Sequence, residues 1–338
     1  MTAREVGGRA WRVHKEAIVI DMLEAMAPAI DVRYFKTLID AGVTAVHATI
    51  PDVADDLPTA TRKIARFYKA IEGTARIAFS GADIEGAKEK GEAVIIAGMQ
   101  ESIPFEGDLD LIRVFHMLGV RVMQIAYFQQ GYLGAGCAEK VDHGLTDRGR
   151  DAVKELDRLG ILIDVSHCGD KTARDTAEAS AKPIAITHST PAGLVDHPRA
   201  RSDATIRAVA ERGGVMGITA LTSFCERKDR VGANPTLSDF VGLIDYVVDL
   251  VGVGHVGLGS DLAPFWKKEE YEAWHKAFGV MRGGRKARPF EERTVEGFTI
   301  SDTIKVTEEL LRHGYSDDET KEVLGGNWLR LVKEVWGG

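Results

Sequence analysis

The stretch TDRGRDAVKELDRLGILIDVSHCGDKTARDTAEASAKPIAITHST (residues 146–190) decides the fold, because it runs helix, strand, helix, strand. Thr146 is a typical helix N-cap and Gly160 a typical residue just after a helix, so a helix is predicted between them. ILIDVSH (161–167) and PIAITH (183–188) are short, mostly apolar runs. Such runs are typical of parallel strands that are buried on both faces.

The same alternation extends over most of the 338 residues. Further apolar runs occur at 17–21, 43–50, 93–100, 120–127, 214–219 and 255–261, and helical patterns at 61–73, 109–119, 171–181, 203–213 and 237–252. Eight apolar strands joined by helices favour an α/β fold that closes into a (β/α)8 TIM-type barrel. A doubly wound open sheet is the alternative, but no Gly-x-Gly-x-x-Gly motif follows the first strand.

The remaining segments are compatible with one barrel domain over residues 1–338. Residues 262–300 form a long, mixed segment after the eighth strand, where an insertion would lie over the barrel mouth as a lid or an oligomer contact. Its apolar and aromatic content makes a homodimer a reasonable expectation. Two extra C-terminal helices are predicted at 301–314 and 317–336.

Composition excludes several classes of partner. The chain has 43 lysines and arginines against 51 aspartates and glutamates, a net charge of −8 with no basic cluster, so no nucleic acid is expected as a partner. The N-terminus lacks a signal-peptide core and no apolar run approaches the roughly 18 residues of a membrane span, so no membrane association is expected. Three cysteines without a Cys-x-x-Cys spacing indicate reduced thiols and a cytoplasmic location.

Residues at strand ends carry the candidate chemistry, because barrel active sites form at the carboxyl ends of the strands. His167 and His188 end two consecutive strands, which lie about 4.8 Å apart in a barrel, so both imidazoles can bind one metal ion. Asp261 ends the eighth strand and is a candidate general base that takes a proton from the attacking water. Hydrogen-bonded core histidines and a helix-capping aspartate are the structural alternatives. Cys168, beside His167, could be a nucleophile but is more simply a small residue at a strand end.

His167, His188 and Asp261, in this order and spacing, make the chain resemble the renal (membrane) dipeptidase family, metallopeptidase family M19 of the amidohydrolase superfamily, as a divergent bacterial-type member. The resemblance runs from about residue 15 to the end. The segments that carry it are LTDRGRDAVKELDRLGILIDVSH (145–167), PIAITHST (183–190), HPRARSD (197–203), VGLGSD (256–261) and VLGGNWLRLV (323–332).

The resemblance implies roles for individual residues. His167 and His188 would bind the more buried of the family's two zinc ions. Arg199 would hold the carboxylate of the substrate, for which a planar guanidinium is well suited. Asp261 would lie at the other metal and handle the proton of the attacking water. Without the resemblance, Arg199 could equally be a surface arginine paired with a loop carboxylate.

The chain departs from the family at the ligands of the more exposed metal. Leu23 and Ala25 occupy the places of the family's His-x-Asp pair, and Gln100, with Glu101 beside it, occupies that of the bridging glutamate. Tyr127 stands where the family has a histidine that stabilises the intermediate. Leucine and alanine cannot bind a cation and glutamine is a weak ligand, so one zinc ion is expected rather than two.

The sequence therefore predicts a site with one metal ion, and three activities are possible for it. Gln100 and Glu101 are candidate further metal ligands, and the Tyr127 phenol is a candidate substrate contact and oxyanion donor, unless it only packs at the barrel rim. A local bulge could bring Glu24 or Glu101 into the site. The first hypothesis is a metal-dependent hydrolase of a small amide, such as a dipeptide or an N-acyl amino acid. The alternatives are a mononuclear-metal enzyme acting on another small carboxylic acid, and a non-catalytic protein that binds a small acid.

Overall fold

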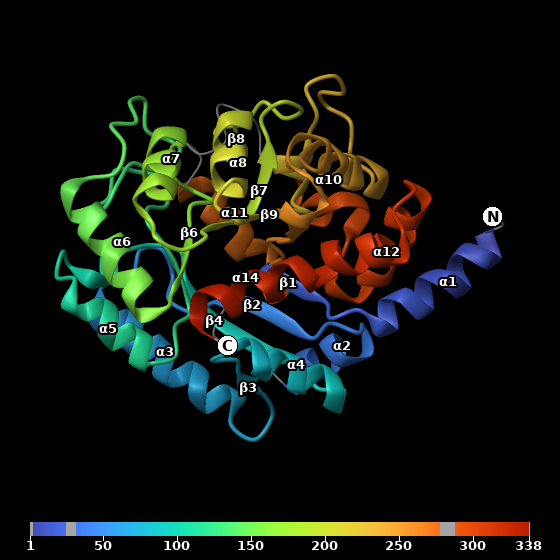
Figure 1. Cartoon of the computed structure of the whole chain (residues 1–338), viewed down its shortest axis with the longest axis horizontal. Coiled ribbons are helices and arrows are strands. Elements are labelled where there is room, and N and C mark those ends of the chain that lie inside the picture. The colour runs from blue at the N-terminus through green and yellow to red at the C-terminus, as the bar shows by residue number, and fades with distance from the viewer. Residues whose placement is uncertain (1–2, 25–31, 278–287, 338) are drawn as a thin grey trace.

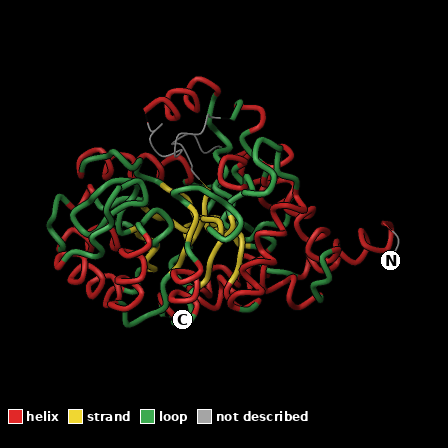
Figure 2. Tube along the Cα trace, turned by 90° about the horizontal axis from the view of Figure 1, so that it is seen from above, coloured by secondary structure: helices red, strands yellow, loops and turns green. Residues whose placement is uncertain are grey.

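The computed structural model describes residues 3–24, 32–277 and 288–337. Its core is a ring of eight parallel strands with helices around it, which Figure 2 shows from above. The strands are β1 (Ile20–Glu24), β2 (Ala45–Thr49), β4 (Val94–Met99), β5 (Val122–Gln124), β6 (Leu162–Asp164), β7 (Ala185–Pro191), β9 (Val215–Ile218) and β10 (Val256–Leu258). The ring closes because β2 pairs with both β1 and β4. The predicted (β/α)8 barrel is therefore confirmed.

The helices cover the outside and the floor of this ring (Figure 1). They are α1 (Ala3–Glu16), α2 (Val32–Asp40), α3 (Leu57–Ile71), α4 (Gly81–Lys90), α5 (Asp110–Met117), α6 (Asp147–Leu159), α7 (Asp170–Ala179), α8 (Asp203–Ala210), α9 (Thr222–Cys225), α10 (Leu237–Val251), α11 (Lys268–Ala277), α12 (Thr303–Arg312), α13 (Asp317–Lys321) and α14 (Asn327–Trp336). Short strands β3 (Arg76–Ile77) and β8 (Ala200–Arg201) pair with β4 and β7. Within the described residues, no helix is both long and apolar enough to cross a membrane.

The barrel floor is packed with apolar side chains around Trp328 of α14. Inward-facing residues of the strands form one cluster with this indole, among them Ile20, Ala45, Val94, Leu162 and Val215. The Trp328 indole donates a hydrogen bond to the Leu258 carbonyl at 3.0 Å. A side chain at Gly257 would meet the indole at 2.2 Å, so glycine is needed there. This floor leaves the opposite, carboxyl-terminal end of the barrel for the polar residues.

The predicted helix over 317–336 is wrong as a single element. It is divided into α13 and α14 by a π-helical turn, Glu322–Gly326. A side chain at Gly325 would lie 2.3 Å from the Ile18 carbonyl oxygen, so the chain passes directly against the backbone before β1. This close approach interrupts the regular α-helical hydrogen bonding and sets the direction in which α14 crosses the barrel floor.

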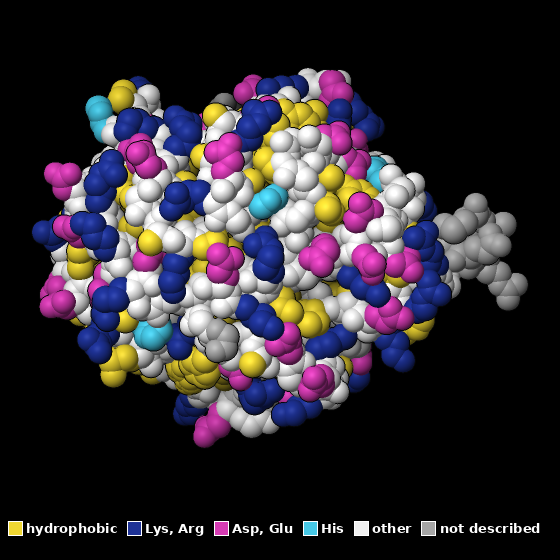
Figure 3. All heavy atoms as spheres, viewed as in Figure 1, with side chains coloured by type: hydrophobic (Ala, Val, Ile, Leu, Met, Phe, Trp, Pro, Cys, Tyr) yellow, Lys and Arg dark blue, Asp and Glu magenta, His cyan; other side chains and the backbone are white. Residues whose placement is uncertain are grey.

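Helices α1, α2, α4, α9 and α11 and strands β3 and β8 were not predicted from the sequence. Helices α1 and α4 each contain two glycines and few apolar residues, and each of these strands is only two residues long. On the face shown in Figure 3, side chains of both charge signs are interspersed. The sequence alternation therefore identified the elements of the ring and missed some of those that decorate it.

Candidate functional site

His167 and His188 meet at the carboxyl ends of β6 and β7. Their Nε2 atoms lie 2.9 Å apart, and both side chains are almost fully buried. The strands are neighbours, with Asp164 opposite Ala185, so residues three positions further along both chains reach the same end of the barrel. Two nitrogens that bind one zinc ion at about 2.0–2.1 Å in a tetrahedral site are about 3.3 Å apart, close to this separation.

Both imidazoles are held neutral by their surroundings. Burial, reinforced by the positive charge of Arg199, lowers the pKa of His167 and His188 well below the ordinary histidine value. The ring of His167 stacks on that of Tyr127, with centroids 3.9 Å apart, and meets the Phe128 ring edge-on. A neutral ring is the form that binds a metal ion.

Arg199 is buried beside the histidine pair and binds the backbone that carries it. Its Nη1 donates a short hydrogen bond to the Ser166 carbonyl, and its Nη2 donates one to the His188 carbonyl at 2.8 Å. Its Nε has no hydrogen-bond partner in the described part of the chain. The guanidinium therefore joins the two histidine segments and also places a positive charge next to them.

Asp261 follows β10 in a strained backbone conformation. Its φ is +60°, which is uncommon for a residue other than glycine, and its amide donates to the Leu23 carbonyl at 3.0 Å. Burial raises the pKa of the Asp261 carboxyl to about 7, although Arg199 opposes this shift. A carboxylate with a pKa near neutrality can both accept and return a proton during a reaction.

Gln100, Glu101 and Tyr127 follow β4 and β5 at the barrel mouth, where the Tyr127 ring adjoins that of His167. Gln100 Nε2 donates to the Thr49 hydroxyl at 2.7 Å, while its Oε1 is buried without a partner. Glu101 accepts hydrogen bonds from the Ser102 amide at 2.7 Å and from the Tyr127 amide at 3.0 Å. Burial, together with the negative charge of Asp261, raises the pKa of the Tyr127 phenol well above its ordinary value, so this group stays a proton donor.

Strand β1 supplies no ligand in place of the family's pair within the described residues. A bulge occurs between Asp21 and Glu24, but Glu24 pairs with Ala48 and Leu262, which belong to the helix-facing core. Neighbours in a parallel sheet project to the same face, so Glu24 points away from the mouth. Leu23 is fully buried, and Ala25 lies outside the described residues.

The polar atoms at the mouth allow a test of whether a metal ion fits. Among the described residues, no group of three or more His, Cys, Asp and Glu side chains is close enough to hold an ion. The histidine pair offers two facing nitrogens, and Gln100 Oε1 is a further buried acceptor without a partner. The two facing nitrogens fit one ion whose other positions are open, and the described residues show no group that would hold a second ion.

Sequence reasoning missed two residues of this region, Asp164 and Thr187. Both are buried beside His188, and the Thr187 hydroxyl contacts the Asp164 carboxylate and the imidazole. An aspartate inside the apolar run ILIDVS was a signal for a buried polar network, because an isolated charge is costly in such a strand.

The family comparison identifies the class of this site. The membrane dipeptidase family, peptidase family M19, matches residues 10–268. The chain belongs to this family. Its reaction class is therefore metal-dependent, dipeptidase-type hydrolysis, and the two alternative activities are not favoured.

Individual relatives agree with this assignment. The chain is similar to a crystal structure of an amidohydrolase from Pseudomonas aeruginosa, with 31% identity, a TM-score of 0.86, and coverage of 97% of this chain and 99% of the other. It is 25% identical over 291 residues to dipeptidase tcpJ of Claviceps purpurea, covering 86% of this chain and 61% of that protein. A metallopeptidase from Rhodobacter sphaeroides, liganded with a phosphinate mimic of the dipeptide L-Ala-D-Ala, shares the fold at 21% identity, with a TM-score of 0.73 over 95% of this chain and 100% of the other.

Proposed function

We propose that the chain hydrolyses a dipeptide or an N-acyl amino acid with one zinc ion held by His167 and His188. The observation that carries this proposal is the 2.9 Å approach of two buried, neutral imidazole nitrogens at the ends of adjacent strands. A zinc ion, when bound, lowers the pKa of water from 15.7 to about 7 and polarises a carbonyl group. The protein groups around the pair then position the substrate and move the proton.

In this proposal Asp261 is the proton carrier. Its pKa of about 7 lets it take a proton from the attacking water and return it to the leaving amine. Tyr127 keeps its phenolic proton and donates a hydrogen bond to the carbonyl oxygen as negative charge develops there. The electrostatic influence of Asp261 on Tyr127 supports placing both groups around one reacting carbonyl.

Arg199 is proposed to bind the terminal carboxylate of the substrate. Its charge is buried, its Nε has no partner, and its Nη groups are fixed by the backbone, so the guanidinium is held in place before substrate arrives. A single fixed cation favours short substrates with a free carboxylate over long peptides. The dipeptide mimic bound to the Rhodobacter sphaeroides enzyme supports the same substrate class.

The residues that follow β1 and β4 support a count of one ion. Leu23 is buried and apolar, and both Glu101 oxygens accept hydrogen bonds from Ser102 and Tyr127. Gln100 and Glu101 remain predictions as metal ligands, and Gln100 is the better placed because its Oε1 has no partner. Zinc itself remains a prediction from the imidazole donors.

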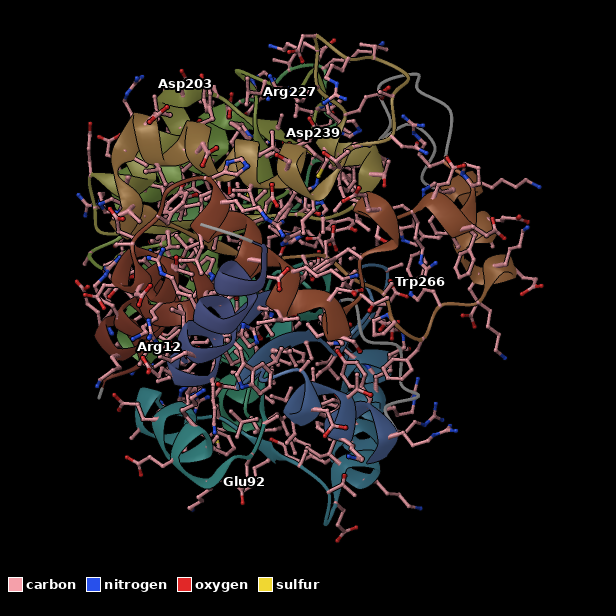
Figure 4. The ribbon with its side chains drawn as sticks, turned by 90° about the vertical axis from the view of Figure 1, so that its right-hand side faces the viewer. Arg12, Glu92, Asp203, Arg227, Asp239 and Trp266 are labelled. Atoms are coloured by element: carbon pink, nitrogen blue, oxygen red, sulfur yellow. The ribbon has the colours of Figure 1, made fainter. Side chains whose placement is uncertain are left out.

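The segment 262–300 is proposed to be the lid predicted from the sequence. Trp274 of α11 packs against the cluster formed by Tyr127 and Phe128, and its ring lies 5.6 Å from that of Trp266. Figure 4 shows Trp266 beside the projecting α11 region. Residues 278–287 of this segment lie outside the described residues. The homodimer and the cytoplasmic location also remain predictions.

Two measurements test the proposed function. Elemental analysis of protein purified without chelator is expected to give about one ion per chain. A panel of L,L and L,D dipeptides and N-acyl amino acids, with and without added zinc, is expected to include at least one substrate whose hydrolysis needs the metal. An ion count near two would refute the single-ion site, and no hydrolysis of any compound in the metal-loaded protein would refute the activity.

A further inference from the structure

Beneath the histidine pair, a chain of three side chains connects the floor of the site to His188. Thr187 Oγ1 lies 2.8 Å from Asp164 Oδ2 and 2.7 Å from His188 Nδ1. All three side chains are almost fully buried, so water does not compete for these hydrogen bonds. The Nε2 atom on the far side of the same ring faces His167.

The other contacts of Asp164 decide how protons are arranged along this chain. Its Oδ1 accepts hydrogen bonds from the amides of Ser166 at 2.9 Å and Thr187 at 3.0 Å, and from the Ser166 hydroxyl. Backbone amides can only donate, so Oδ1 is an acceptor. Oδ2 is an acceptor too, because the Thr187 hydroxyl donates to it at 2.8 Å.

The direction of each hydrogen bond then follows by elimination. Thr187 has one hydroxyl proton and donates it to Asp164 Oδ2. Its contact with His188 must therefore be donated by the ring, from Nδ1–H to Thr187 Oγ1. A neutral imidazole with a proton on Nδ1 carries a free lone pair on Nε2.

We infer that Asp164, acting through Thr187, fixes His188 in the tautomer whose Nε2 lone pair points into the site. Asp164 and Thr187 are positioning residues in this inference. The tautomer assignment stands on the hydrogen bonds alone, and only its consequence for metal binding rests on the proposed function. Outer hydrogen bonds of this kind orient metal-binding histidines.

His167 provides the contrast within the same pair. Its Nδ1 is buried with no hydrogen-bond partner among the described residues, and its ring stacks on Tyr127 and meets Phe128 edge-on. With the His188 Nε2 lone pair facing it at 2.9 Å, His167 carries its proton on Nε2 in the metal-free protein. Metal binding then requires this proton to leave Nε2 of His167, whereas His188 needs no rearrangement.

The tautomers can be measured in the full chain without metal, by long-range 1H–15N spectra of protein labelled on its histidines. Two other buried histidines serve as references, because carbonyl oxygens only accept. His47 Nδ1 lies 2.7 Å from the Met22 carbonyl and must be protonated, and His14 Nε2 lies 2.8 Å from the Ala41 carbonyl and must be protonated. His188, identified by the loss of its signals in His188→Gln, is expected to match His47.

We call the hydrogen-bonded chain of Asp164, Thr187 and His188 the relay. Substitutions in it are expected to change the His188 tautomer or the zinc affinity. Asp164→Asn keeps an oxygen that accepts from the two amides and the Ser166 hydroxyl. Its NH2 group then faces Thr187 and donates to the Thr187 hydroxyl oxygen. The Thr187 hydroxyl in turn donates its proton to His188 Nδ1. The tautomer is expected to invert. Thr187→Val removes the link and is expected to lower zinc affinity about 10- to 100-fold in competition with a chelator. Thr187→Ser restores the hydroxyl and should restore both readouts.

Thr190→Val is the matched control, because Thr190 lies on the same strand, is equally buried, and its hydroxyl has no partner. It is expected to change neither tautomer nor zinc affinity. A proton on Nε2 of His188 in the wild-type protein would overturn the inference. So would an unchanged tautomer in Asp164→Asn. The expected tautomers in a protein that binds no zinc would support the relay and refute the proposed metal site.

Discussion

Asp164 on β6 and Glu24 on β1 are both buried carboxyl groups near the mouth of the same barrel, but their surroundings differ. Asp164 accepts hydrogen bonds from two amides and two hydroxyls, and connects through Thr187 to His188. Among the described residues, neither oxygen of Glu24 has a hydrogen-bond partner, and burial raises the pKa of this group well above its ordinary value.

This difference extends to the strands that carry them. We call β1, β2, β4 and β5 the first half of the mouth, and β6, β7, β9 and β10 the second half. The second half carries His167, His188, Arg199 and Asp261, and the first three of these are held by hydrogen bonds or ring stacking. The first half buries Leu23 and turns Glu24 toward the helices. The proposed function therefore places the metal ion in the organised second half.

Removing a ligand from the second half is expected to have the largest effect. His167→Ala takes away one of two facing nitrogens, and the remaining imidazole alone cannot hold the ion. Elemental analysis should fall from about one ion per chain to none, with loss of peptide hydrolysis. His116→Ala, on the outer helix α5, is the control and should keep the ion. An ion retained by His167→Ala would show that the half-site is wrongly assigned.

The proton carrier gives the next largest effect. Asp261→Asn is expected to lower kcat by about 10²- to 10⁴-fold, because general base catalysis is lost. In the wild-type protein the base works only when ionised, so activity should rise as the pH goes up through about 7, the pKa of Asp261. This limb of the pH–rate profile should be absent from the variant. If Asp261→Asn keeps the same rise of activity with pH, the group that titrates is not Asp261.

In the first half, Tyr127 is the residue expected to contribute to the reaction itself. Tyr127→Phe keeps the stacking on His167 and removes only the phenolic donor, so kcat should fall by about 10²-fold if this donor stabilises the oxyanion. Tyr132→Phe, on the following loop and exposed, is the control. A loss no larger than that of the control would mean that Tyr127 serves only to pack the His167 ring.

How much of the fold and of the site could be predicted from the sequence also differs between the two halves of the mouth. Apolar runs predicted all eight barrel strands, because strands buried on both faces leave a continuous hydrophobic pattern. The two histidines were placed at adjacent strand ends by the same reasoning, and the structure brings them together. The direction of Glu24 depends on a one-residue bulge, and the Thr187 link depends on a register that residue types do not encode.

Buried carboxyl groups in the first half should also destabilise the protein as the pH rises. Burial raises the pKa of Asp21 from an ordinary 3.8 to about 6, so the folded state holds a proton that the unfolded chain releases. The contribution of Asp21 to the free energy of unfolding should therefore fall by about 3 kcal/mol as the pH rises from about 4 to 7.

Asp21→Asn tests this effect, because its amide oxygen can still accept from the Ser260 and Leu23 amides while no charge is formed. Denaturant unfolding at several pH values should show a shallower decline for the variant. Asp142→Asn is a control of opposite sign, because the hydrogen bonds of Asp142, above all those from Thr172, hold the pKa of that carboxyl below its ordinary value. Parallel curves for wild type and Asp21→Asn would mean that Asp21 is ionised throughout.

The smallest effect is expected from returning one carboxylate to the first half. Gln100→Glu places a charged oxygen where Gln100 Oε1 now has no partner, but Leu23 opposite still offers no donor. One carboxylate does not make a second site, so the ion count should stay at about one and zinc affinity should change by less than about tenfold. Gln129→Glu, on the loop after β5, adds the same charge at an exposed side chain and controls for it. A rise to two ions would mean that the first half lacks only one metal ligand rather than several. The difference in metal binding between the two halves would then depend on residue 100 alone.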